Sequence, residues 1–197
     1  MKKIIFTVGF LVFFPAISFA ASEAVLTKDS VSGKTTFIAK GWPSALKIVG
    51  TAGAPSGKIS LDEKSKKLDG EFELPLDDLD TKLSLRNRHM KENYLETDKF
   101  PVSKLKISGL DFDLMGSKSG VPFSGMLTLH GVDKEISGKM DYEVEGETFV
   151  IKCEFSIKTS DFAIKQVNYM GITVAETIDL TVELSATKKL FTESSKK

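Results

Sequence analysis

Apolar and polar residues alternate along several segments of this chain, and this period of two restricts the fold more than any other feature. The clearest example covers residues 149–157, where apolar side chains share one face while Lys152, Glu154 and Ser156 share the other. The same pattern recurs over residues 178–186, 72–76 and 123–129. A period of two is typical of a β-strand with one buried face. The chain therefore has to bury the apolar faces of many strands.

Shorter candidate strands lie between Gly, Pro, Asp-Glu and Gly-Glu turn signals. They are residues 25–28, 35–40, 45–49, 57–61, 104–110 and 134–144. One apolar face per strand is buried either by stacking two sheets or by curling one sheet on itself, and closure also removes exposed edges. We predict a single, mainly β domain of antiparallel strands with one short α-helical insertion, built as two stacked sheets or as a closed antiparallel β-barrel. A barrel of about eight strands has an interior filled by side chains or able to hold one slender ligand.

The inward side chains predict the chemistry of that interior. Fourteen phenylalanines against three tyrosines and one tryptophan make it apolar rather than hydrogen-bonding, so a cavity would suit a hydrocarbon chain. The predicted cavity residues are Phe37, Phe72, Leu74, Leu76, Phe123, Leu127, Leu129, Phe149, Ile151, Phe155, Ile178, Leu180 and Val182.

One segment, Asp80 to Thr97, has helical rather than strand periodicity. At 3.6 residues per turn, Asn87 falls in the middle of an apolar stripe, and a buried amide is costly unless it is hydrogen-bonded. Two readings of Arg86, Asn87, Arg88 and His89 remain open. They form a hydrogen-bonded network that fixes the helix to the barrel, or Arg86, Arg88 and His89 form a polar rim that contacts a ligand headgroup.

The chain begins like an exported protein. Lys2 and Lys3 precede an apolar run that ends at Ile17, and small residues stand at Ser18 and Ala20. This pattern predicts a signal peptide over residues 1–20, cleaved after Ala20, and therefore a periplasmic or secreted protein. The domain is expected over residues 21–187, with a flexible tail over residues 188–197 and fraying at both ends. The remaining chain has no long apolar stretch, so no membrane span is expected.

Charge and residue counts argue against several classes of function. The 27 basic and 27 acidic side chains balance, which gives no electrostatic footprint for nucleic acid. Two histidines and one cysteine do not make a metal cluster, and no cofactor or nucleophile motif is found, so no catalytic residue is predicted. Cys153 reads as a small buried side chain, with a homodimer left as the alternative. Trp42 reads as a plug at one end of the barrel or as an aromatic gate for a ligand.

The segment Leu85-Arg86-Asn87-Arg88-His89-Met90 resembles the Arg-Asp-x-His signature of the YceI-like family. Residues 125–132 and 161–164 resemble two further landmarks of that family, in the same order. The resemblance implies a lipocalin-like barrel in the periplasm, in which some members hold a polyisoprenoid or another long-chain amphiphile. Asn87 departs from the usual Asp and Ala163 from the usual Gly, and the first change removes a carboxylate that acid-base chemistry would need.

We therefore expect a non-enzymatic binding protein that holds a long isoprenoid or similar amphiphilic lipid in its barrel. Each methylene moved from water into such a cavity contributes about 0.8 kcal/mol, so roughly ten contribute about 8 kcal/mol before ordering costs. Two alternatives remain. One is a filled barrel that acts as an envelope protein-interaction or stress-response module. The other is an enzyme acting on a lipid or quinone-like substrate, with His89 and Arg86 as its candidate groups.

Overall fold

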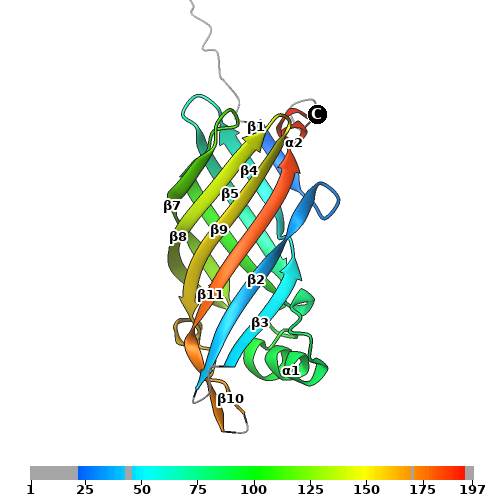
Figure 1. Cartoon of the computed structure of the whole chain (residues 1–197), viewed down its shortest axis with the longest axis vertical. Helices are drawn as coiled ribbons and strands as arrows, with labels where there is room; N and C mark the ends of the chain where they lie inside the picture. The colour runs from blue at the N-terminus through cyan, green and yellow to red at the C-terminus, as the bar shows by residue number, and fades with distance from the viewer. Residues whose placement is uncertain (1–21, 43–45, 170, 194–197) are drawn as a thin grey trace, which may run out of the picture.

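A computed structural model of the chain describes residues 22–42, 46–169 and 171–193. Eleven antiparallel strands form one sheet that curls into an elongated barrel (Figure 1). The strands are β1 (Ser22–Leu26), β2 (Val31–Trp42), β3 (Leu46–Gly53), β4 (Ser56–Asp62), β5 (Lys67–Pro75), β6 (Val102–Asp111), β7 (Lys118–Leu129), β8 (Val132–Glu145), β9 (Thr148–Lys158), β10 (Asn168–Tyr169) and β11 (Ile172–Thr187). The predicted fold class is confirmed. Every predicted strand is present, most of them longer than the alternation indicated.

The barrel has a seam that the sequence does not reveal. The strand order is β1-β4-β5-β6-β7-β8-β9-β11-β2-β3, so β1 and β3 are the two end strands of the sheet. The ring is completed by chain continuity, because β1 leads into β2 and β3 leads into β4 within a few residues. One isolated bridge, between Thr51 of β3 and Asp80, ties the free edge of β3 to the helical segment. The barrel is therefore closed by short chain connections and by the bridge to Asp80, not by pairing of β1 with β3. We expected closure to remove all strand edges, but β1 and β3 each keep one.

Glycines let aromatic rings lie along the inner wall. Gly138 of β8 pairs with Phe123 of β7, and a Cβ atom on Gly138 would come within 2.8 Å of the Phe123 ring. Gly50 of β3 stands in the same relation to Phe37 of β2. Because the rings lie over glycines instead of crossing the barrel, the phenylalanines cover the wall without filling the centre.

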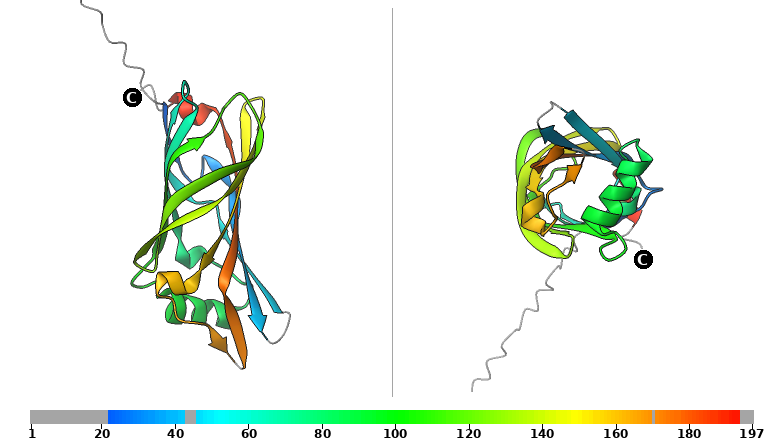
Figure 2. Two further views of the ribbon diagram at one scale, coloured as in Figure 1. Left: turned by 90° about the vertical axis from the view of Figure 1, so that its left-hand side faces the viewer. Right: turned by 90° about the horizontal axis from the view of Figure 1, so that it is seen from below.

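A helical segment covers one end of the barrel, the lower end in Figure 1. It consists of α1 (Ser84–His89) followed directly by η2 (Met90–Leu95), a π-helical stretch; the short 3₁₀ turns η1 (Leu76–Asp78) and η3 (Thr159–Phe162) lie nearby in the fold. Seen from below, α1 lies at one side of the opening (Figure 2). The helix is shorter than predicted, because Asp80 is engaged in the bridge to Thr51 and Glu96 ends the helix with a positive φ of 46°.

The opposite end of the barrel is closed by aromatic side chains. Phe112, Phe149 and Phe191 stack in sequence, with ring centroids 5.8 and 6.2 Å apart. Phe191 belongs to α2 (Lys189–Glu193) and is only 2% exposed. Within the predicted tail, residues 189–193 are therefore helical, and the buried Phe191 holds them against the barrel. Residues 22–26, where we expected fraying, form β1 and pair with β4.

Residues 1–21, which contain the predicted signal peptide, and residues 194–197 lie outside the described part of the chain. Within the described ranges, no helix combines the length and the apolar character that crossing a bilayer requires.

Candidate ligand-binding cavity

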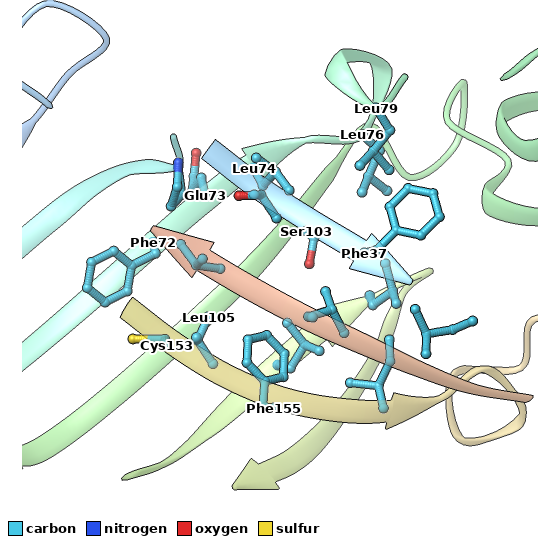
Figure 3. Close-up of a pocket in the computed structure, with 18 of the residues that line it drawn as sticks. Phe37, Phe72, Glu73, Leu74, Leu76, Leu79, Ser103, Leu105, Cys153 and Phe155 are labelled. Carbon is cyan, nitrogen blue, oxygen red and sulfur yellow. The ribbon is translucent and has the colours of Figure 1, made fainter. Parts of the chain in front are cut away.

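The barrel encloses a long apolar cavity of about 710 Å³. All thirteen apolar residues predicted to face a cavity line it, from Phe37 on β2 to Val182 on β11. Figure 3 shows Phe37, Phe72 and Phe155, from three different strands, gathered around the same space. The alternation of Leu76 with Leu74 predicted that Leu76 lies in a strand. Leu76 does line the cavity, but it belongs to the 3₁₀ turn η1. Whether these residues bind a ligand remains a prediction.

The cavity is narrow for its length. Along β11 the lining residues run from Ile172 to Ala186. At ~3.4 Å per residue and a strand tilt of ~40°, this segment spans roughly 35 Å along the barrel axis. A volume of about 710 Å³ spread over that length gives a channel that suits a single extended chain.

Exposure along the wall shows which end is open. The lining residues at the aromatic end, including Phe112, Phe149 and Phe191, are buried. Mid-barrel lining residues such as Leu180 are half-buried, because the hollow interior leaves part of their surface uncovered. The lining residues at the helical end include Leu83 of the loop before α1, which is 56% exposed. The cavity therefore has a closed aromatic end and a mouth beside α1.

Polar groups in the mid-barrel wall are already satisfied by the protein. The Thr35 hydroxyl donates to the carbonyl of Gly53 at 3.2 Å, and the Ser103 hydroxyl donates to the carbonyl of Thr128 at 3.1 Å. Cys153 faces the hollow, as the alternation predicted, and burial raises the pKa of its thiol to about 12. Glu73, the acidic residue of the lining, is paired with Lys104 at 2.8 Å. Because these polar groups already have partners and the rest of the wall is apolar, a hydrocarbon chain matches the cavity best.

The mouth carries a compact hydrogen-bond network centred on the buried Thr81. The Asn87 side-chain oxygen accepts from the Thr81 backbone N–H at 2.8 Å and from its hydroxyl at 2.6 Å. Arg86 donates from Nε to the Thr81 hydroxyl at 2.8 Å and from Nη2 to the Thr81 carbonyl at 2.6 Å. The Asn87 amide nitrogen donates to Asp80 Oδ1 at 2.7 Å. Since Asp80 is bridged to Thr51 of β3, this network fixes the helix to the barrel, as one of the two readings predicted.

Arg86 also lines the cavity, so for this residue the prediction of a polar rim around a ligand headgroup remains open as well. A guanidinium has five N–H donors, and the two bonds to Thr81 use two of them. His89 lines the mouth as well. Arg88, which was also predicted at the polar mouth, is exposed and does not line the cavity. It projects from the outer side of the helix.

A second tie holds the end of the helical segment, through a pairing that the sequence analysis did not predict. His130, in the β7–β8 turn, places Nε2 2.9 Å from Glu96 Oε2 and Nδ1 3.1 Å from the carbonyl oxygen of Phe162. Lys99, followed by His130, lowers the pKa of Glu96 from its ordinary value.

Two other groups considered in the sequence stand apart from the cavity. Trp42 is 74% exposed at the end of β2 and is not part of the lining. Trp42 therefore acts neither as a plug nor as a gate. The residue before it, Gly41, faces the cavity, since a Cβ atom there would contact the cavity residues Ile172 and Leu46. The next residue of a strand faces the opposite side. Among the described residues, no group of three or more His, Cys, Asp or Glu side chains is arranged to hold a metal.

An antiparallel barrel with one apolar cavity and a helix beside its mouth defines a fold of the lipocalin-like type. The YceI-like domain model matches residues 14–186, and the chain belongs to the YceI-like family. Comparison with curated protein sequences gives no match.

Solved structures with this fold come from several bacteria. A polyisoprenoid-binding domain from Saccharophagus degradans, implicated in plant cell wall breakdown, aligns with a TM-score of 0.62 at 15% identity and covers 85% of this chain and 98% of its own. BcnA of Burkholderia cenocepacia aligns at 0.66 and 15% identity, covering 79% of this chain and 96% of its own. The Campylobacter jejuni YceI protein aligns at 0.59 and 16% identity, covering 95% and 99%. At these identities the likeness concerns the fold.

Proposed function

We propose that this protein binds one long, extended apolar chain, of the polyisoprenoid or a similar amphiphilic type, in its barrel and carries it through the periplasm. The observation that carries the proposal is the cavity, about 710 Å³, lined from end to end by apolar side chains and open at one end. The similar fold of a polyisoprenoid-binding domain supports the choice of ligand, and the leader-like residues 1–20 support the location.

The closed end and the mouth give the ligand a direction. Phe112, Phe149 and Phe191 stop the chain at one end, so the tail enters first. At the mouth, Arg86 and His89 face the ligand, and Arg86 keeps donors that Thr81 does not use. A headgroup that accepts hydrogen bonds, such as a hydroxyl or an anionic group, fits this position. Binding energy then comes from the tail and orientation from the headgroup.

The two alternatives have less support. A filled barrel would place Phe72, Leu127, Phe149 and Leu180 in continuous packing, whereas all four line the hollow. A catalytic role for Arg86 would compete with its two bonds to Thr81, which hold it in a structural network. We infer that binding, without chemical conversion, is the activity.

Thermal unfolding with added prenyl alcohols and prenyl phosphates of graded length tests this proposal. A ligand that binds only the folded barrel raises Tm, and we expect the rise to grow with chain length until the ~35 Å channel is filled. Leu180→Trp fills the middle of the channel and should remove the Tm rise, while Val150→Ser, at an exposed position on the neighbouring strand β9, should keep it. No Tm rise with any length would refute the proposal.

A further inference from the structure

We propose that the mouth end of the barrel docks onto the surface of a phospholipid bilayer through an apolar lip formed by Trp42, Leu46, Leu83 and Leu85. The inference rests on the proposed lipid-binding function and adds the place where the lipid enters and leaves. It concerns the outer surface around the mouth, where Leu46, Leu83 and Leu85 are exposed beside the cavity that they also line.

The exposed apolar side chains are unevenly distributed. Nine large apolar side chains are exposed in the described part of the chain, and the four lip residues are among them. Trp42 is 74%, Leu83 56% and Leu85 46% exposed. All four belong to segments at the helical end of the barrel, where α1 and the tips of β2 and β3 lie (Figures 1 and 2). An apolar cluster of this kind in water marks a surface that contacts something else.

The continuity of the lip with the cavity indicates that its partner is a lipid bilayer. Leu46, Leu83 and Leu85 are exposed and at the same time line the cavity. An apolar surface therefore runs without interruption from the channel wall to the outside of the protein. If the lip rests in the acyl boundary of a bilayer, a tail moves from one hydrocarbon phase to another without crossing water, where each exposed methylene would cost about 0.8 kcal/mol. A protein partner would not need this continuity.

The chemistry of the lip suits the interfacial zone of a membrane. Trp has an apolar body and one N–H donor, a combination that is enriched at membrane–water interfaces. Exposed cations accompany the apolar residues: Lys47 follows Leu46, and Arg88 lies one helical turn after Leu85. Neither Lys47 nor Arg88 takes part in an ion pair among the described residues. Long basic side chains beside apolar ones can reach headgroup phosphates while their stems stay in the boundary.

The sole tryptophan of the chain makes the test direct. Ligand-free protein is mixed with phosphatidylcholine vesicles, with and without phosphatidylglycerol, and both Trp42 fluorescence and co-flotation are measured. We expect a blue shift of the emission and vesicle-bound protein, with more protein bound when phosphatidylglycerol is present. Trp42→Ser should lower the vesicle partition coefficient at least tenfold, because a tenfold change corresponds to about 1.4 kcal/mol and burying a large apolar side chain contributes more than that. Met115→Ser, at an exposed site in the β6–β7 loop, is the matched control and should bind like the wild type.

The docking proposal and the cavity proposal fail separately. Trp42 does not line the cavity, so Trp42→Ser should keep the Tm rise produced by prenyl lipid in the absence of vesicles. Equal vesicle binding by the wild type and Trp42→Ser, or no binding by either, would overturn docking while leaving the cavity result untouched. A concentration-dependent dimer that Trp42→Ser dissociates in sedimentation would also overturn it, since a second copy would then cover the lip.

Discussion

The side-chain oxygen of Asn87 accepts two hydrogen bonds from Thr81, one from the backbone N–H at 2.8 Å and one from the hydroxyl at 2.6 Å. The amide nitrogen of the same side chain donates to Asp80 at 2.7 Å. This position therefore needs an acceptor on one side and a donor on the other. An amide supplies both, whereas the carboxylate that the family usually carries here supplies only acceptors.

Asn87→Asp should consequently destabilise this protein, although it restores the usual family residue. The new carboxylate would face Asp80 at hydrogen-bond distance, and like charges that close repel. We expect a loss of about 1–3 kcal/mol in the free energy of unfolding at pH 7, measured by urea denaturation. Adding Asp80→Asn should recover most of the loss, because the amide then stands on the other side of the pair. A double variant no more stable than Asn87→Asp would contradict this account.

Low pH should destabilise the part of the protein around Asp80. The side chain of Lys82, followed by that of Asn87, holds the pKa of Asp80 well below its ordinary value. A lowered folded-state pKa means that the unfolded chain binds the proton first, so this contribution to stability is present above about pH 4 and is lost as the pH falls further. Glu96, whose pKa is lowered by Lys99 and His130, acts in the same direction.

The measurement is Tm between pH 2.5 and 6.5. We expect Tm to fall with falling pH, and we expect a shallower fall for Lys82→Met, which removes the largest cause of the Asp80 shift. Identical pH profiles for the wild type and Lys82→Met would show that the Asp80 pair does not contribute.

Phe191 should be essential for closing the aromatic end. It is 2% exposed and packs on Phe149 with ring centroids 6.2 Å apart. Phe191→Ala removes a fully buried ring and should cost about 3–5 kcal/mol in urea denaturation. Met115→Ala, at an exposed position, should change stability by less than about 0.5 kcal/mol. Equal effects of the two substitutions would mean that α2 does not hold the barrel end.

Cys153 should react slowly with soluble alkylating reagents. Burial raises its thiol pKa from 9.0 to about 12, which lowers the reactive thiolate fraction near neutral pH roughly 1000-fold. Reaction with iodoacetamide, followed by mass, should be slow in the native protein and fast in urea. A bound prenyl chain should slow it further, since Cys153 lines the cavity. Rapid native modification would place the thiol in contact with bulk solvent.

The sequence predicts the strands and the inward residues well, because alternation depends on which face is buried and not on distant partners. Phe149 and Phe155 follow that rule and line the cavity. What alternation cannot show is whether inward side chains meet. The hollow depends on rings lying over glycines on neighbouring strands, as Phe123 does over Gly138. Cross-strand pairing of this kind has no local sequence signal.

The errors at the ends of the barrel have the same origin. Helical periodicity continues upstream of Ser84, yet Asp80 is held in a bridge to a distant strand, so the helix starts later. One aromatic residue in a polar tail, Phe191, was too weak a pattern to predict α2, and its burial depends on packing against the distant Phe149 at the closed end of the barrel. Trp42 was interpreted as a plug because its neighbours in sequence indicated a bend at one end of the barrel, whereas it is the last residue of β2 and its register turns it outward.

Native mass spectrometry of the protein purified from bacterial cells, without detergent, tests the central claim most directly. We predict a folded species heavier than the chain by the mass of one long-chain lipid, released on collisional activation and identified as an isoprenoid by its fragments. Leu180→Trp, which blocks the middle of the channel, should give a folded protein without that added mass. A wild-type barrel that is always empty, or one that keeps the same adduct after Leu180→Trp, would contradict the assignment of the cavity as the binding site.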